Sequence, residues 1–251
     1  MSETTAQVTE AFRSLLGLRS FTQELDRLPA DSTRLDDESF LGFCYKNCHR
    51  SQAQLFQDLF VAYQLREKQG GYFVEFGAAD GIELSNTWLL EKDYRWRGIL
   101  AEPAHIWHER LERNRGCIVD HRCVWSKSGE KLGFNETAQP ELSTLDAYTA
   151  SDGHAPAREA GKHYQVATVT LNDLLAGHGA PRQIDYLSVD TEGSELEILR
   201  GFDFERYRVE IITVEHNHAP AREQIHALLE SKGFRRKFEP LSQWDGWYVA
   251  A

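Results

Sequence analysis

The chain has 251 residues, 41% of them hydrophobic and 11% aromatic, so it can bury a sizeable core and is not globally disordered. Its formal net charge of −11 disfavours a nucleic-acid or anionic-membrane partner, because both need clustered cationic charge. Since it has no long apolar run, no signal-peptide pattern at its start and only four cysteines, we expect a cytoplasmic protein without a membrane helix or a disulfide framework.

The first 50 residues are predicted to form an N-terminal helical extension, followed by a main domain over residues 51–251. Apolar side chains lie near helical spacing in the extension, and Pro29 with its neighbouring turn formers interrupts them. A second helix follows, and Gly70 and Gly71 end it as glycines commonly do. Its apolar stripe consists of Leu55, Phe56, Leu59, Phe60 and Tyr63.

Strands and helices alternate along the rest of the chain. Strands are expected over residues 72–76, 98–102, 117–125, 184–190 and 209–215, with two terminal strands in 234–239 and 246–250. Helices are expected over about 85–92, 103–115, 194–200 and 221–232, and residues 166–176 read as a strand followed by a helix. Strands that are apolar throughout are typical of a mainly parallel sheet covered on both faces. The predicted fold class is therefore α/β, a Rossmann-like, doubly wound domain.

A polar stretch over residues 126–164 interrupts this alternation. It shows no clear period and is longer than an ordinary connection between two elements. We expect it to be either a functional loop or a disordered one.

Carboxylates follow the ends of four predicted strands. In an open parallel sheet, ligands bind beyond the carboxyl ends of the strands, so these side chains meet at one edge. Because unpaired carboxylates at such an edge cost free energy, their gathering favours a ligand site. The acids are Glu75, Glu102, Asp190 with Glu192, and Glu215.

The turn after the first strand indicates the kind of ligand. Its sequence, Gly-Ala-Ala-Asp-Gly over residues 77–81, departs from the dinucleotide pattern, and acids at Glu75 and Asp80 would repel a pyrophosphate. They would attract a sulfonium or an ammonium group instead. Glu102, at the end of the next strand, is expected to accept hydrogen bonds from both ribose hydroxyls. A nucleoside with a cationic amino-acid tail fits this set, and S-adenosylmethionine is such a molecule.

Six motifs in order resemble those of the FkbM family of S-adenosylmethionine-dependent methyltransferases. They are Ser51-Gln52, Glu75 to Gly81, Ser85-Asn86-Thr87, Trp96 to Pro103, Asn114-Arg115 and Asp190 to Glu195, and the resemblance covers all but the helical extension. It implies a class I methyltransferase fold and O-methylation of a hydroxyl on a carbohydrate or secondary metabolite. The main domain would then be the methyltransferase domain, with residues 126–164 as an acceptor-side loop or insertion.

The predicted cofactor site gathers residues from four strand ends. Gly77 and Gly81 would let the backbone approach the methionine part of the cofactor, unless they only form a tight turn. Asn86 has an equal alternative role as a helix cap. Cys123 and Val124 are about as well explained by packing in the core. The predicted cofactor-binding residues are Glu75, Gly77, Ala78, Asp80, Gly81, Ser85, Asn86, Glu102, Pro103, Cys123, Val124 and Asp190.

Catalytic residues are expected on the fourth and fifth strand ends. Methyl transfer needs a positioned acceptor and a base for its hydroxyl proton, and a histidine has a suitable pKa. The candidates are Asp190, Glu192, Glu215, His216 and His218. A divalent cation held by Asp190, Glu215 and one histidine is an alternative that we do not predict, and a structural cluster is another. Glu195 has either a direct role or only a favourable place at a helix N-terminus.

Partners and rival functions follow from the same residues. A small-molecule or glycan acceptor is expected. The basic residues His154, Arg158, Lys162 and His163 suggest that the 126–164 stretch recognises an anionic or glycan acceptor, and a solvated connection is the equal alternative. Two other functions remain open: a non-catalytic nucleoside-binding Rossmann module, and an NAD(P)-dependent sugar-nucleotide enzyme. The acidic turn disfavours the second of these.

Overall fold

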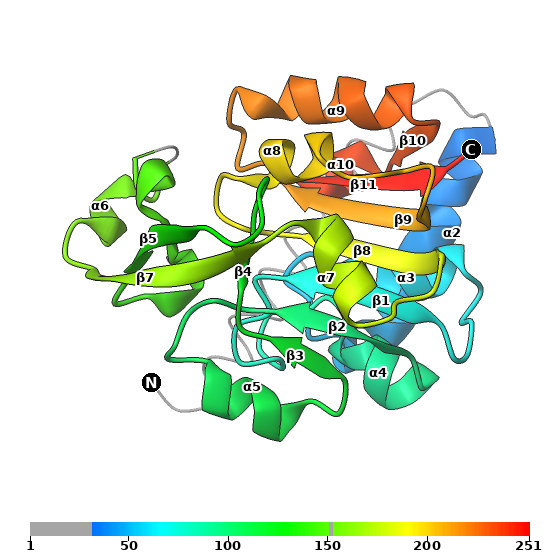
Figure 1. The fold of residues 1–251 in the computed structure, drawn as a ribbon. Helices are drawn as coiled ribbons and strands as arrows, with labels where there is room; N and C mark the ends of the chain where they lie inside the picture. Colours follow the sequence, from blue (N-terminus) through cyan, green and yellow to red (C-terminus); the bar gives the residue numbers. More distant parts are fainter. Residues whose placement is uncertain (1–31, 151–152) are drawn as a thin grey trace, which may run out of the picture.

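The computed structural model describes residues 32–150 and 153–251, so the predicted extension before Ser32 lies outside the described residues. A seven-stranded sheet forms the centre of the molecule (Figure 1), in the order β10-β11-β9-β8-β1-β2-β3. Its strands are β1 (Tyr72–Phe76), β2 (Arg97–Ala101), β3 (Ile118–Asp120), β8 (Gln183–Val189), β9 (Arg208–Glu215), β10 (Phe234–Lys237) and β11 (Asp245–Ala250).

The direction of the strands gives the fold class. From β9 to β3 every neighbouring pair is parallel, whereas β11 runs antiparallel to both β9 and β10. The first five strands of this sheet along the chain thus have the spatial order 3-2-1-4-5 that defines the Rossmann arrangement. The prediction of a Rossmann-like class I methyltransferase fold is confirmed, with the two terminal strands pairing beside β9.

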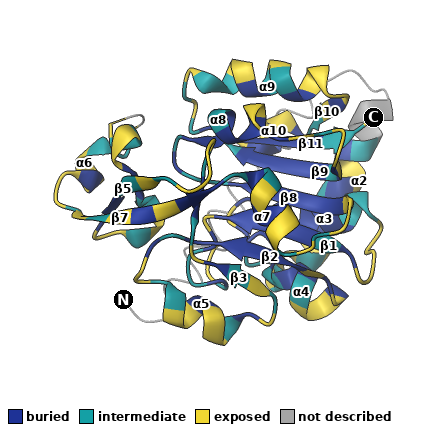
Figure 2. Cartoon of the chain, in the orientation of Figure 1, coloured by how far each residue is buried: buried dark blue, intermediate teal, exposed yellow. Residues whose placement is uncertain are grey.

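Helices cover both faces of the sheet, and the sheet is buried between them (Figure 2). The helices are α2 (Ser32–Asn47), α3 (Gln57–Gln64), α4 (Trp88–Tyr94), α5 (His108–Asn114), α7 (Leu171–Gly177), α8 (Glu195–Arg200), α9 (Ala221–Ser231) and α10 (Glu239–Ser242), with the 3-10 turn η1 (Cys48–Arg50) after α2. Side chains alternate between the faces, so Val74 and Phe76 join the core under α7, α8 and α9, and Phe73 joins the core under α2, α3 and α4.

Helix α2 shares a core with the main sheet. The ring of Phe40 stacks on Phe238 with centroids 4.4 Å apart and meets Phe60 and Trp247 edge-on. These rings belong to α2, to α3, to the residue before α10, and to β11. The predicted division of the chain at residue 50 stays a prediction, and the described part of the extension packs on the main domain.

The polar stretch over residues 126–164 is folded for the most part. It contributes to a second, four-stranded sheet, β4-β7-β5-β6, which lies beside the main sheet (Figure 1). The strands are β4 (Cys123–Val124), β5 (Lys131–Glu136), β6 (Thr144–Leu145) and β7 (Lys162–Val169), joined by η2 (Pro140–Leu142), η3 (Asp146–Tyr148) and α6 (Ala155–Arg158). The long antiparallel pairing of β5 with β7 stabilises a segment whose polar sequence hides its strands.

Several element boundaries differ from the prediction. The helix expected to end at Gly70 and Gly71 is α3, which ends at Gln64, before the positive φ of Arg66 and Glu67. The predicted strand 117–125 is two strands, β3 and β4, which belong to different sheets. The helix expected from Pro103 begins at His108, because Ala104 is bonded to Glu102 rather than to a helical turn. The helix expected from about Ser85 begins at Trp88, since Ser85 and Asn86 are bonded to Glu75.

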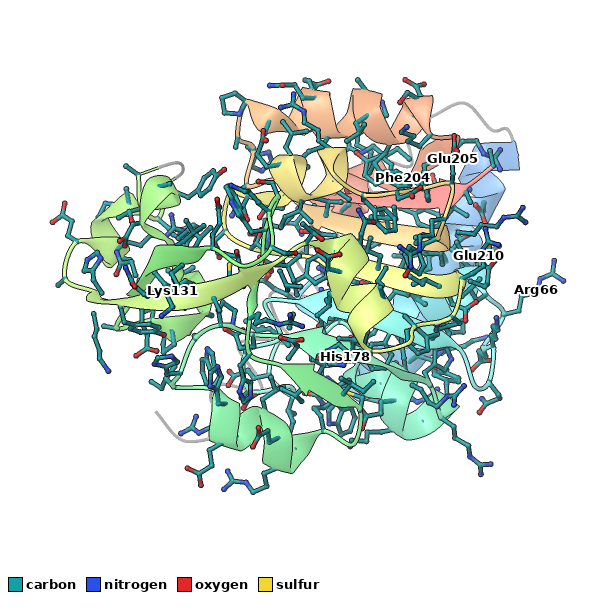
Figure 3. All side chains as sticks on the ribbon, viewed as in Figure 1. Arg66, Lys131, His178, Phe204, Glu205 and Glu210 are labelled. Carbon is teal, nitrogen blue, oxygen red and sulfur yellow. The ribbon has the colours of Figure 1, made fainter. Side chains whose placement is uncertain are left out.

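The surface is polar, and charged side chains such as that of Arg66 extend from it (Figure 3). No helix in the described part of the chain is long and apolar enough to cross a membrane. All four cysteines are free thiols.

Candidate functional site

A cavity of about 500 Å³ opens at the carboxyl ends of β1, β2, β8 and β9. The turns after these strands form one wall, and residues of the second sheet, among them Phe134 and Leu145, form the other. Its volume falls within the range of small-molecule sites, roughly 300–1,000 Å³. The second sheet therefore closes the edge at which the sequence predicts a ligand.

Strained backbone gathers at this cavity. Five of the described non-glycine residues with positive φ line it. Such conformations cost free energy and persist where the surrounding structure imposes them, which is common at ligand sites. The five are Ala79, Leu84, Glu192, Asn217 and His218.

The two glycines of the first turn are required by close packing. A Cβ on Gly77 would lie 2.2 Å from the Asp190 carbonyl oxygen, and one on Gly81 would lie 2.7 Å from Arg115 and Leu111 side-chain carbons. Both glycines also have positive φ. Gly77 brings the turn against the end of β8 and lines the cavity with Ala78, whereas Gly81 lies behind the cavity wall.

Glu75 is committed to an internal network. Its Oε1 accepts the Asn86 backbone N–H at 2.7 Å, and its Oε2 accepts the Thr87 hydroxyl. The guanidinium of Arg115, which is buried, lies 3.7 Å away. Burial still raises the pKa of Glu75 above its usual range, against the opposing charge of Arg115. The carboxylate borders the cavity but is not the free negative charge that the sequence suggests, because the loop before α4 and Arg115 surround it.

Asp80 and Ser85 lie outside the cavity lining. One oxygen of Asp80 accepts the backbone N–H groups of Ile82 and Glu83, which fixes the turn. The Ser85 hydroxyl donates to Glu75 and accepts from Arg115 Nη1. The two residues shape the cavity wall from behind, as Gly81 does.

Asn86 lines the cavity. Its Nδ2 donates to the Ser188 hydroxyl on β8 at 2.9 Å, and it does not cap α4, whose N-cap residue is Thr87. The residue is 8% exposed, and its Oδ1 has no hydrogen-bond partner. This oxygen is an acceptor that the protein leaves unused.

Glu102 lies at the end of β2 in the cavity wall. Its two oxygens accept the backbone N–H groups of Ala79 and Ala104 at 2.9 and 2.8 Å. Burial, opposed by these bonds and helped by the charge of Glu136, raises the pKa of Glu102 to about 7. Each carboxylate oxygen has a further lone pair, so both can accept a second hydrogen bond. Beside it, Pro103, Cys123 and Val124 supply an apolar stretch of wall.

Three acids gather at the ends of β8 and β9. Carboxylate oxygens of Asp190, Glu192 and Glu215 lie within 4.8 Å of one another, and this trio is the one potential metal-binding group found among the described residues. Burial and the charge of Glu192 raise the pKa of Asp190 well above its usual range, and burial and Asp190 do the same for Glu215. No histidine belongs to the trio, in contrast to the cation site considered from the sequence.

Arg158 of α6, beside the second sheet, is fully buried and binds one acid of this trio, Glu192. Its Nη2 donates to Glu192 Oε2 at 2.8 Å, and its Nε donates to the Leu142 carbonyl at 2.8 Å. The side chain of Asn135 holds the Arg158 carbonyl. The 126–164 segment is thereby bonded to an acid at the end of the main sheet's β8.

The other acids and histidines differ in position. Glu195 accepts the N–H groups of Thr191 and Gly193, so it holds the turn before α8 and does not line the cavity. His218 lines the cavity, but His216 does not. His216 is buried, its Nδ1 accepts the His218 N–H, and burial together with Arg222 and Arg236 lowers its pKa to about 4. Of the two candidate histidines, His218 is therefore the one beside the cavity, and a catalytic role for either stays a prediction.

Sequence reasoning missed several residues of the site. Arg115 belongs to a quoted motif, but nothing in the sequence indicates its pairing with Glu75. Asp245 of β11 lines the cavity and accepts from Gln57 Nε2 at 2.7 Å, 188 residues away along the chain. Only the folded chain brings these partners together.

Comparison with known proteins identifies relatives of this chain. The family model described as the Methyltransferase FkbM domain matches residues 75–236. Methyltransferase sdnD of Sordaria araneosa is 44% identical over 192 residues, covering 65% of this chain and 73% of the relative. Methyltransferase 1 of Beauveria bassiana (strain ARSEF 2860) is 27% identical over 170 residues, covering 59% of this chain and 67% of the relative.

One solved structure is a distant match. The crystal structure of MtNAS in complex with MTA and tNA has a TM-score of 0.35 at 13% identity, covering 94% of this chain and 70% of that chain. The fold class given above follows from the strand order and not from this likeness.

Proposed function

Because the chain belongs to the FkbM methyltransferase family, we propose that it uses S-adenosylmethionine to methylate a hydroxyl of a carbohydrate or secondary metabolite. The observation that carries the cofactor assignment is Glu102, a buried carboxylate at the end of β2 with spare lone pairs in the wall of the cavity. A carboxylate at this strand end suits a ribose diol.

The cofactor's parts match different stretches of the cavity wall. Glu102 would accept the ribose hydroxyls, and Pro103, Cys123 and Val124 would contact the adenine. The exposed backbone of Gly77 and the free Oδ1 of Asn86 would bind the methionine part, with Oδ1 accepting from its ammonium group. S-adenosylmethionine supplies a methyl group on a sulfonium, and S-adenosylhomocysteine remains after transfer.

We assign the general base to His218, the histidine of the predicted pair that lines the cavity. The acceptor oxygen takes the methyl carbon in an in-line displacement and loses its proton to the imidazole. Asp190 and Glu215 would orient the acceptor, because their oxygens lie close together at the same edge.

A divalent cation is a second candidate for the orienting role. Carboxylate oxygens are the ligands that Mg²⁺ prefers, and Asp190 and Glu215 fit such an ion. Glu192 fits less well, since one of its oxygens is bonded to Arg158. Activity that survives exhaustive treatment with EDTA would exclude this candidate.

Isothermal titration with S-adenosylhomocysteine and with NAD separates the proposed function from its rivals. Binding of the former alone supports a methyltransferase, and binding of NAD alone supports a sugar-nucleotide enzyme. Binding of S-adenosylhomocysteine without turnover of any acceptor would leave the non-catalytic module. A chain that binds neither compound does not have the proposed function.

A further inference from the structure

The cavity is strongly acidic. Its lining contains no lysine or arginine among the described residues, and it contains eight carboxylates. They are Glu75, Glu83, Glu102, Glu141, Asp190, Glu192, Glu215 and Asp245. Because charges in a partly closed site are weakly screened, this excess acts on any ligand that enters.

Cations of the protein neutralise two of these acids. Arg115 pairs with Glu75, and Arg158 pairs with Glu192. Glu102 and Asp245 accept hydrogen bonds from neutral donors only: backbone N–H groups for the first, and side chains of Gln57 and Trp247 for the second. No lysine or arginine in the described ranges forms a salt bridge with Asp190 or Glu215.

Three of the four basic residues that suggested an anionic or glycan acceptor are engaged elsewhere. The guanidinium of Arg158 is bonded to Glu192, and His163 is bonded to Asp146 at 2.8 Å. The ammonium of Lys162 lies over the ring of Tyr164, 5.8 Å from its centroid, and Lys162 does not line the cavity. Of the four, His154 alone lines the cavity, so the other three give an anionic acceptor no support.

Two separate sets of acceptor atoms in the cavity lack a cationic partner. One is Asn86 Oδ1, buried and without any partner, and the other is the Asp190–Glu215 pair, whose oxygens lie within 4.8 Å of each other and whose Glu215 accepts from a neutral donor, Asn217 Nδ2, at 2.8 Å. S-adenosylmethionine carries a single ammonium group and can satisfy one set. If that group goes to Asn86, as the proposed function has it, the acidic pair is left for the second substrate.

We propose that the methyl acceptor carries an ammonium group as well as its hydroxyl, and that the Asp190–Glu215 pair binds this ammonium. Two carboxylates that lie together without a cation of the protein repel each other, and an ammonium bound between them relieves this repulsion. An anionic acceptor would meet uncompensated negative charge at the same place. This inference rests on the proposed function and names the chemical class of its acceptor.

Three probes that differ in charge test the proposal: glucosamine, glucose and glucuronic acid. Their binding is measured by isothermal titration on the protein saturated with S-adenosylhomocysteine. Glucosamine is expected to bind at least about tenfold more tightly than glucuronic acid, with glucose between them. Equal affinity, the reverse order, or no binding by any of the three overturns the proposal.

Two variants link the preference to the pair. Glu215→Gln should remove most of the preference for glucosamine over glucose, whereas Glu141→Gln, which removes an exposed carboxylate of the cavity lining, should keep the preference. Glu215→Gln should also raise the melting temperature, because it removes repulsion between buried acids, and this rise shows that the variant folds. A preference that survives in Glu215→Gln contradicts the assignment.

Two further measurements distinguish a failure of this proposal from a failure of the proposed function. If Mg²⁺ binds the free protein and abolishes the glucosamine preference, the pair is a metal site and the proposal is wrong. If S-adenosylhomocysteine does not bind, the proposed function fails, and the charge preference can still be measured on the unliganded protein.

Discussion

The fully buried guanidinium of Arg158 donates to Glu192 at 2.8 Å, and this bond joins the second sheet to the acids of the main sheet. Glu192 is also held at its backbone, where its carbonyl accepts the Thr144 hydroxyl at 3.0 Å. With a positive φ of 58°, Glu192 is in a conformation that needs such support. Arg158 and Thr144 of the 126–164 segment thus fix Glu192, one of the three clustered carboxylates.

Replacing Arg158 by methionine should destabilise the protein by about 3–5 kcal/mol, because it leaves Glu192 as an uncompensated buried charge beside Asp190. The free energy of unfolding from urea denaturation measures the loss. The double variant Arg158→Met with Glu192→Gln should recover most of it. Equal losses in the single and double variants would mean that the ion pair is not what Arg158 contributes.

Gly77→Ala should cost more stability than Gly70→Ala. The two glycines have nearly the same φ, 69° and 68°, so both variants bear the same backbone strain of about 1 kcal/mol. Only at Gly77 would the new Cβ collide with the Asp190 carbonyl, while at Gly70 nothing lies within 4 Å. Melting temperatures compare the two variants directly. Equal shifts would refute the close approach of Gly77, after β1, to the Asp190 carbonyl, after β8.

Substituting His218 by asparagine should lower kcat by about 100-fold or more, because the acceptor hydroxyl would lose its base. His216→Asn is the matched control two residues away, and it should change kcat far less since His216 does not line the cavity. Both rates need an acceptor that is turned over. Should the two variants lose activity equally, or the control lose more, His218 is not the base.

The stability of the free protein should fall as the pH rises from about 4.5 to about 7, and Glu102 should account for part of that fall. The folded-state pKa of Glu102, about 7, lies above its ordinary value of 4.5, so the folded state binds the proton more tightly than the unfolded state. The contribution of Glu102 to the free energy of unfolding is fully present below pH 4.5 and is lost as the pH rises through 7. The loss amounts to about 3 kcal/mol at most.

Comparing Glu102→Gln with the wild type isolates the contribution of Glu102 to this pH dependence. Asp58 and Asp245, whose pKa values burial raises to about 6, act in the same direction in both proteins and cancel. The wild type should therefore lose more stability than Glu102→Gln over this pH range in urea denaturation. Parallel curves would show that Glu102 titrates normally.

The sequence predicted the main sheet and the edge at which the cavity opens, because both leave local signals. Strands buried on both faces are apolar throughout, and an acid that follows such a strand is predicted to lie at the edge of the sheet. The second sheet left no such signal, since β5 and β7 are half exposed and stabilised by pairing across a long loop. The same holds for the charges. The sequence presents Glu75 and Arg158 as free ions, and only the fold shows that Arg115 and Glu192 neutralise them.

The affinity of S-adenosylhomocysteine for the wild type and for Glu102→Ala tests the central claim most directly. Isothermal titration at one pH gives both dissociation constants, and Glu141→Ala, at the exposed cavity mouth, serves as the control. If Glu102 accepts the ribose hydroxyls, the variant should bind at least about tenfold more weakly, since charged hydrogen bonds contribute about 1.5–3 kcal/mol, while the control binds as the wild type does. Unchanged affinity in Glu102→Ala, or no binding to the wild type, would contradict the account.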